Sequence, residues 1–254
     1  MILGCKKDHT DTRDYLMRAY LPIGRLPVKV DYTSKMSPVK NQGNEGTCVG
    51  FASIIGMKEY QEKLDYKRYI GLSPRFVYSE CKKLDKMPGE GTTIRAAMKV
   101  LKKLGVCEEV YWPYRPFQSD RAKSGARANA KTNKILTYAR IVDLYELKAA
   151  LVQKGPCVIG VKVFRGMMET KTGLVPLPKR GERMLGGHAI CPVGYDDNKG
   201  RIKFKNSWSA SWGDKGFGYL GYDYLESFMM DAWSSVDITD ANPLTISSIL
   251  KIAK

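Results

Sequence analysis

A cysteine at position 48 stands where a thiol could act as a nucleophile. It follows a glycine-rich loop at residues 43–47 and precedes an apolar helical pattern that begins at Val49. Backbone N–H groups and the positive end of a helix dipole stabilise a thiolate there and lower the thiol pKa from its free value of roughly 8.5. We therefore expect Cys48 to be reactive, and nucleophilic catalysis then requires a base, an orienting group and an oxyanion donor elsewhere in the chain.

The candidate base is His188, which follows Gly186-Gly187 at the start of an apolar strand pattern. It lies 140 residues after Cys48, within the roughly 130 to 150 residues that separate a cysteine and a histidine brought together in the fold. The other histidine, His9, is in a polar segment and is a poorer candidate. A strand-edge histidine taken alone is more often structural, so the pairing with Cys48 carries the prediction.

An amide follows on the next predicted strand, in the run Lys205-Asn206-Ser207-Trp208. An imidazole base needs a partner that fixes its ring orientation without taking its proton. The side-chain oxygen of Asn206 can do this, and Trp208 can shield the hydrogen bond from water. An asparagine in a loop would otherwise be read as a turn residue.

Gln42 is the candidate oxyanion donor. It lies six residues before Cys48, separated from it by a loop that can curl back. Its side-chain NH2 and the backbone N–H of Cys48 could hydrogen-bond an oxyanion together, an interaction worth on the order of 3 kcal/mol in comparable sites. The alternative interpretation is an exposed loop glutamine.

Several function classes are disfavoured by composition. The 254 residues are 43% hydrophobic, enough for one large domain or two small lobes that share a cleft. No apolar run approaches the roughly 18 residues that span a bilayer. The first residues carry charges too early for a signal peptide. We therefore expect a globular protein without a membrane segment.

A formal charge of +16 raises the question of an anionic partner. Residues 121–140 hold six basic side chains and no acidic one, so nucleic acid or an acidic substrate could bind there through a salt-sensitive attraction. No aromatic platform accompanies the basic residues. We favour a solvated loop between lobes, and we do not expect nucleic acid as a partner.

The six cysteines do not have metal-site spacing. No C-x-x-C pair occurs, and only two histidines are available, so we expect neither a metal nor a cofactor. Cys157 and Cys191 lie in apolar strand patterns and are expected to be buried. Cys81 and Cys107 flank a helical segment and could be a disulfide or two buried thiols.

Helical patterns come first and strands later, which indicates an α+β chain with two lobes. We predict helices at residues 49–66, from Pro74 with Ser73 as its N-cap, from Thr92 or Thr93 to Leu104, and at 144–154. Strands are predicted at residues 135–142, 157–164, 188–195, 201–206 and 216–224. The resulting division is an N-terminal arm at 1–25, a helical lobe at 26–132, a β-rich lobe at 133–235 and a C-terminal extension at 236–254.

With these motifs in order, the chain resembles a papain-like cysteine peptidase. The resemblance covers about residues 26 to 225 and rests on residues 38–43, Cys48 with its helix, 186–189, 193–196, 205–208 and 212–219. It implies a helical left lobe and a β-barrel-like right lobe, with a cleft between them for an extended peptide. Cys48 would attack the scissile carbonyl, His188 would protonate the leaving amine and Asn206 would orient His188. Gln42 and the Cys48 N–H would form the oxyanion hole.

The resemblance also implies a substrate-binding set. Gly91 matches the glycine strip that pairs with the substrate backbone, although Glu90 breaks the usual glycine pair. Thr92 and Thr93 would face the pocket for the second residue before the cut. Gly187 and Trp208 would line the site beside the base.

Two residues depart from the family pattern near the nucleophile. Glu45 stands where the family has a cysteine, disulfide-bonded in secreted relatives, and Val49 stands where it has an aromatic residue. The missing disulfide fits a reducing compartment, so we favour the cytoplasm. Residues 1–25 resemble the short leader of prokaryotic-type members, and our hypothesis is that this arm packs on the body and covers part of the cleft.

These features predict a monomeric endopeptidase that hydrolyses peptide or protein substrates through a thioester. With two histidines, the chain lacks the paired-histidine loop of dipeptide-removing relatives. Three alternatives remain: a transpeptidase or ligase in which an amine replaces water, a catalytically weak binding protein that uses the basic surface, and a nucleic-acid-binding protein.

Overall fold

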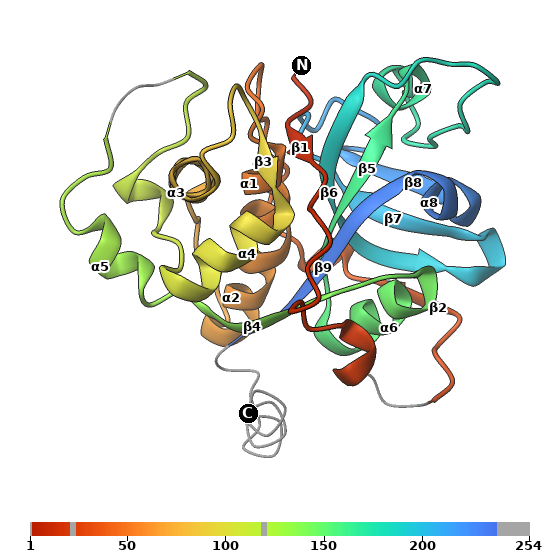
Figure 1. The fold of residues 1–254 in the computed structure, drawn as a ribbon. Helices are drawn as coiled ribbons and strands as arrows, with labels where there is room; N and C mark the ends of the chain where they lie inside the picture. The colour runs from red at the N-terminus through yellow and green to blue at the C-terminus, as the bar shows by residue number, and fades with distance from the viewer. Residues whose placement is uncertain (1, 21–23, 118–120, 238–254) are drawn as a thin grey trace.

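Helices and a seven-stranded sheet form the two halves of the molecule (Figure 1). The computed structural model describes residues 2–20, 24–117 and 121–237. The sheet has the order β4-β9-β5-β6-β7-β8, with β2 added beside β6, and all its pairings are antiparallel. Its strands are β2 (Lys29–Asp31), β4 (Ile135–Arg140), β5 (Val158–Val163), β6 (Gly186–Asp196), β7 (Arg201–Lys205), β8 (Phe217–Gly221) and β9 (Met229–Asp237).

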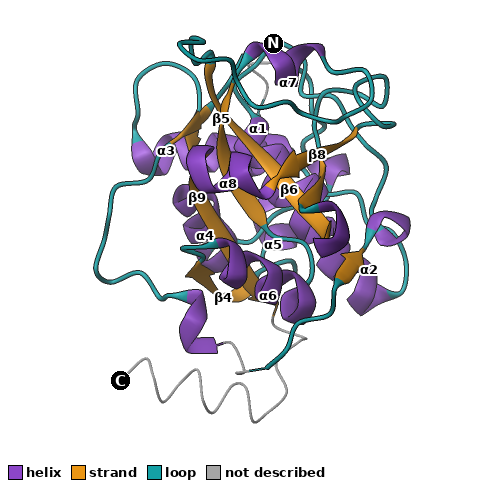
Figure 2. Ribbon diagram, turned by 90° about the vertical axis from the view of Figure 1, so that its right-hand side faces the viewer, coloured by secondary structure: helices purple, strands orange, loops and turns teal. Residues whose placement is uncertain are grey.

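The helices divide between the two halves. Figure 1 shows α1 to α5 on one side of the molecule, and Figure 2, viewed from the sheet's side, shows α6 and α8 against the strands. They are α1 (Cys48–Phe51), the π-helix η3 (Ala52–Lys58), α2 (Glu59–Tyr66), α3 (Pro74–Asp85), α4 (Ile94–Lys103), α5 (Ala126–Ala130), α6 (Leu144–Lys154), α7 (Arg165–Glu169) and α8 (Tyr222–Phe228). Short 3-10 turns lie at Met17–Tyr20, Thr33–Lys35, Glu109–Tyr111 and Asp197–Lys199.

The predicted helix starts are confirmed by their caps. Ser73 accepts a hydrogen bond from the Phe76 N–H at 3.1 Å, and Pro74 occupies the first turn of α3. Thr93 caps α4 through the Ala96 N–H at 3.2 Å. Each cap satisfies a backbone donor that the first helical turn leaves without a partner.

The helix after Cys48 is continuous from residue 48 to 66, but its middle is a π-helix. A Cβ added at Gly56 would lie 2.4 Å from the Cys191 Cβ, so β6 packs directly on the helix backbone. The Ile55 carbonyl accepts hydrogen bonds from the buried Lys205 Nζ at 2.8 Å and from Ser37 Oγ at 3.0 Å. A π-helical turn changes the usual hydrogen bonds of the helix backbone. The buried Ile55 carbonyl in this turn finds hydrogen-bond donors in side chains instead.

The structure differs from the sequence prediction in one strand end and in several elements that were not predicted. The strand predicted at 216–224 ends at Gly221, and α8 begins at Tyr222. The helix turns Tyr224 inward, where its OH donates to the Lys162 carbonyl at 2.8 Å. No sequence pattern predicted α5, α7, β2 or β9, the last of which lies between β4 and β5 in the sheet.

Each half has a large hydrophobic core. One lies among α1, η3, α3 and α4 and includes Phe51, Ile54 and Leu101. The other lies against the sheet and includes Ile190 and Phe204. An α+β architecture with a helical and a β-rich part is therefore confirmed.

All six cysteines are buried and free. Cys81 and Cys107 are two buried thiols rather than a disulfide, and Cys157 and Cys191 are buried as expected. Among the described residues, no group of three or more histidine, cysteine, aspartate or glutamate side chains is arranged to hold a metal ion.

The basic stretch at residues 121–140 is spread over a loop, α5 and β4. Arg127 pairs with Glu80 at 2.8 Å, and Arg140 pairs with Asp231 at 2.6 Å. Part of its charge is thus neutralised within the protein. No helix in the described ranges is long and apolar enough to cross a membrane, and most of the expected C-terminal extension lies outside those ranges, at 238–254.

Candidate active site

Cys48 is the first residue of α1 and is completely buried. Burial raises the pKa of its thiol, and backbone hydrogen bonds from Ala189, Gly4 and Val49 offset part of this effect. The expectation that the helix start would lower the pKa is therefore wrong for this arrangement, because removal of water outweighs the backbone dipoles. The bond from Ala189 places the thiol beside the residue that follows His188.

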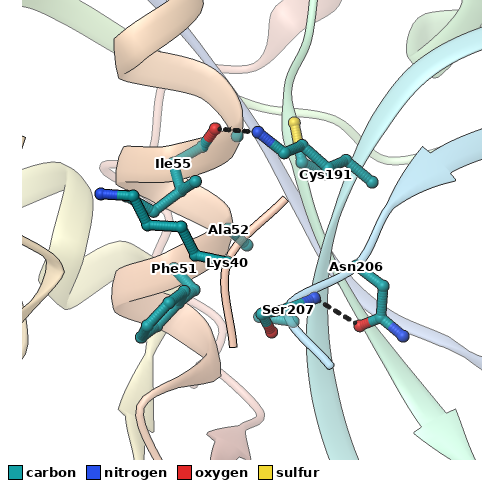
Figure 3. A pocket seen from close by; sticks show the side chains of 10 residues that line it. Lys40, Phe51, Ala52, Ile55, Cys191, Asn206 and Ser207 are labelled. Carbon is teal, nitrogen blue, oxygen red and sulfur yellow. Dashed lines mark hydrogen bonds between the residues drawn. The ribbon is translucent and has the colours of Figure 1, made fainter. Parts of the chain in front are cut away.

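His188 lies on β6 and is completely buried. Its Nε2 is 2.8 Å from the Asn206 Oδ1, and its Nδ1 has no hydrogen-bond partner in the described part of the chain. Ser207 N–H donates to the same Asn206 oxygen at 2.8 Å (Figure 3), which fixes the amide's orientation. The Nε2 atom therefore donates to Asn206, and the Nδ1 lone pair is free.

Trp208 covers the imidazole. The two rings stack with centroids 4.4 Å apart and an angle of 26° between their planes. The tryptophan is itself buried, so it keeps water from the hydrogen bond between His188 and Asn206. Burial lowers the pKa of His188 to about 4, and the hydrogen bond that His188 donates to Asn206 opposes the shift.

Gln42 is buried, not an exposed loop residue. Its Oε1 accepts from Ser207 Oγ at 2.6 Å, which directs the Nε2 donors the other way. Nε2 donates to the Glu45 carbonyl at 2.9 Å and to the Ile2 carbonyl at 3.3 Å. Ser207 thus holds both amides of the site, a role that the sequence analysis missed although the residue lies between Asn206 and Trp208.

A small cavity separates the helix after Cys48 from β7 (Figure 3). Its lining includes Lys40, Ala52, Ile55 and Asn206, and a hydrogen bond to the Ile55 carbonyl crosses it (Figure 3). That bond comes from Lys205, whose pKa burial lowers to about 8. The buried Lys205 ammonium therefore links the helical half to the sheet, one residue before Asn206.

The N-terminal segment runs across the site, between the helices and the sheet (Figure 1). Strand β1 (Cys5–Lys6) pairs in parallel with β3 (Thr92–Thr93), and the Thr92 N–H donates to the Gly4 carbonyl at 3.0 Å. A Cβ at Gly91 would lie 2.3 Å from the Gly4 oxygen, and one at Gly187 would lie 2.3 Å from the Cys5 oxygen. Both predicted substrate-facing glycines therefore face the backbone of this segment.

The threonine side chains beside Gly91 are engaged elsewhere in this arrangement. Thr92 Oγ1 donates to Asp85, and Thr93 Oγ1 caps α4. Both residues are buried, and both pair with β1. A role for them in substrate binding remains a prediction.

Asp8 holds the N-terminal segment to α4 and β9 after it has passed β3. Its backbone N–H donates to Asp231 at 2.7 Å, and its carboxylate accepts from the Arg95 N–H at 3.1 Å and from Trp233 Nε1 at 3.2 Å. Cys5 is also buried, with its sulfur against Gly160. We expected the arm to pack on the body, but its polar composition did not indicate which of its residues would be buried.

These residues bring a thiol, an imidazole with a free nitrogen, an orienting amide and a second amide that hydrogen-bonds a peptide carbonyl into one site. The family model described as papain family cysteine protease matches residues 26–232. The chain belongs to the papain family of cysteine proteases. The expected fold class and enzyme class are thereby confirmed.

Three relatives illustrate the similarity. Xylellain, a cysteine protease from Xylella fastidiosa, superposes with a TM-score of 0.84 at 29% identity, covering 93% of this chain and 96% of that one. An uncharacterised peptidase C1-like protein of Acanthamoeba polyphaga mimivirus is 34% identical over 79% of this chain and 70% of its own length. Mouse (Mus musculus) cathepsin K is 30% identical over 78% of this chain and 60% of its own length.

Proposed function

We propose that this papain-family chain is an endopeptidase whose catalytic residues are Cys48, His188, Asn206 and Gln42. The observation that carries the proposal is the hydrogen bond from Gln42 Nε2 to the Ile2 carbonyl at 3.3 Å. A peptide carbonyl thus lies on the amide that we propose as the oxyanion donor, and the Gly4 backbone of the same segment hydrogen-bonds the buried Cys48 thiol.

The reaction then proceeds in two halves. His188 Nδ1 takes the proton of the Cys48 thiol, and the sulfur attacks the scissile carbonyl carbon. Gln42 Nε2 and the Cys48 N–H hydrogen-bond the oxyanion that forms. The imidazolium gives its proton to the leaving amine as the C–N bond breaks, which leaves a thioester. His188 next deprotonates a water molecule that attacks the thioester, releasing the acid and restoring the thiol.

Residues 2–8 lie where the substrate would lie, so we propose that they hold the enzyme latent. The segment passes from Gln42 at Ile2 to Gly91 at Gly4 and then to β3. A substrate whose residues before the cut pair with Gly91 would run in the opposite direction along the site. The reversed direction gives a physical reason why the arm can occupy the site without being cleaved there.

Cleavage of a peptide library with blocked ends tests the proposal. We expect internal cleavage by the chain without residues 2–6, slower internal cleavage by the full chain, and none by Cys48→Ala in either form. Cleavage by the Ala variant at the rate of the natural chain would contradict the assignment. Adding an amine acceptor separates hydrolysis from transpeptidation, because only a transpeptidase would join the acceptor to the new carboxyl end.

A further inference from the structure

Glu45, at the position of the family's disulfide cysteine, forms a buried ion pair. Arg75 Nη1 and Nη2 donate to its two carboxylate oxygens at 2.7 and 2.5 Å, and both residues are buried. The carboxylate also accepts from the Phe117 N–H at 3.0 Å. Planar, two-point contact of this kind fixes direction as well as distance.

Arg75 connects the loop at residues 42–47 to two other segments. It lies in the first turn of α3, and its Nη2 also donates to the Arg115 carbonyl at 2.6 Å. Its guanidinium lies over the Tyr114 ring, 4.9 Å from the centroid. The ion pair therefore joins the loop to α3 and to the segment around residue 115.

Tyr114 ties the two ends of the same loop together. Its hydroxyl donates to the Gln42 carbonyl at 2.6 Å and lies 2.8 Å from the Thr47 Oγ1. The Gln42 side chain is also held, because its Nε2 donates to the Glu45 carbonyl at 2.9 Å. Tyr114 thus holds the main chain of Gln42. Glu45, whose carboxylate Arg75 binds, holds the Gln42 side chain.

Glu90, the residue that breaks the glycine pair, acts on the same loop. Its carboxylate accepts a hydrogen bond from the Gly46 N–H. Both acidic departures from the family pattern, Glu45 and Glu90, therefore hold the segment that carries Gln42.

We propose that Glu45, Arg75 and Tyr114 are positioning residues that hold the Gln42 amide at the oxyanion hole, in place of a disulfide at position 45. The inference rests on the proposed role of Gln42. Loosening this cluster leaves the thiol and imidazole in place but lets the Gln42 donors leave the developing oxyanion. An ion pair with hydrogen bonds also persists under reducing conditions, where a disulfide would be reduced.

The test compares steady-state kinetics of full-length variants on one fluorogenic peptide. Glu45→Gln keeps the side-chain size but removes the charge that Arg75 binds. Removing an oxyanion donor lowers kcat by about 100- to 1,000-fold in comparable enzymes. For a donor that is present but misplaced, we expect a loss of kcat of about 10- to 100-fold with KM nearly unchanged. Tyr114→Phe, which keeps the ion pair, should lower kcat by a smaller factor.

Two further measurements separate positioning from a structural defect. Alkylation of Cys48 by iodoacetamide needs no oxyanion hole, so its rate in Glu45→Gln should match that of the natural chain. In Gln42→Ala, adding Glu45→Gln should cause no further loss of kcat, because both act through one donor.

A matched control is available on α3. Glu80 has the same exposed fraction as Glu45, 7%, and pairs with Arg127 and Lys83. Glu80→Gln should leave kcat unchanged. The inference is wrong if Glu45→Gln and Tyr114→Phe keep the natural kcat, or if the losses from Gln42→Ala and Glu45→Gln multiply. A natural kcat in Gln42→Ala would instead contradict the proposed function itself.

Discussion

At the scale of single residues, burial leaves the proposed catalytic pair uncharged. It raises the pKa of the Cys48 thiol and lowers that of His188 to about 4. At neutral pH the arm-covered site therefore holds a thiol and a neutral imidazole rather than an ion pair. Entry of water after the arm leaves would favour the charged forms of both groups.

The buried imidazole makes stability depend on pH. The folded-state pKa of about 4 lies below the ordinary 6.5, so the unfolded chain binds more protons between these pH values. Stability is gained as the pH rises through this window and lost as it falls, by up to about 3 kcal/mol.

Urea unfolding of the natural chain and His188→Leu at pH 4, 5, 6 and 7 measures this effect. Other titrating groups are common to both proteins, so the difference between them isolates His188. We expect the natural chain to lose stability relative to the variant as the pH falls. A difference that does not vary with pH would rule out a depressed His188 pKa.

Residue types and spacing predicted the four proposed catalytic residues, since each belongs to a local motif with a chemical purpose. The partner of Glu45 could not be predicted, because Arg75 lies on another helix and no spacing rule joins them. The direction of the Cys48 pKa shift could not be predicted either. It depends on burial of the thiol, and one backbone group at the thiol is Gly4, 44 residues earlier in the sequence.

At the scale of elements, the helix behind Cys48 and strand β6 have no space between them at Gly56. A Cβ there would lie 2.4 Å from the Cys191 Cβ and 2.7 Å from its sulfur. A glycine in a helix interior lowers helix stability relative to alanine. The reason for a glycine at this position is the close approach of the sheet.

Gly56→Ala should therefore lower the free energy of unfolding, by about 1 to 3 kcal/mol, as other overpacked cores do. Chemical denaturation measures the change. Gly24→Ala is the control, because an added Cβ there has no heavy atom within 4 Å. Equal stability of the two variants would show that the two elements can separate at little cost.

The arm is the second element with a testable role. The hydrogen bonds that Gln42 and Thr92 donate to its Ile2 and Gly4 carbonyls must break before a substrate can bind. At about 1 kcal/mol each, these bonds predict that deleting residues 2–6 raises kcat/KM by at least about tenfold.

Peptide turnover by the shortened and full chains measures this effect. Arg13→Ala is a suitable control, since Arg13 is on the arm but its side chain is exposed and pairs with Asp11. Identical kinetics in the shortened and full chains would exclude a gating role for the arm.

At the scale of the whole molecule, the order of helices and strands predicted the α+β class, and the motifs predicted the two halves around the site. The path of the arm did not follow from composition. We expected the arm to pack on the body, but its sequence did not show that Asp8 and Asp14 would meet Arg95 inside the protein. Such long-range ion pairs give no periodic signal in a sequence.

The proposed mechanism requires Cys48 to be the reactive thiol among six buried cysteines. The most direct measurement is labelling with a peptidyl epoxide, followed by peptide mapping by mass spectrometry, on the full chain and on the chain without residues 2–6. We predict one label per molecule on Cys48, faster in the shortened chain, and none in Cys48→Ala, which should also lose peptide cleavage. Labelling at another cysteine, or undiminished cleavage by Cys48→Ala, would contradict the account.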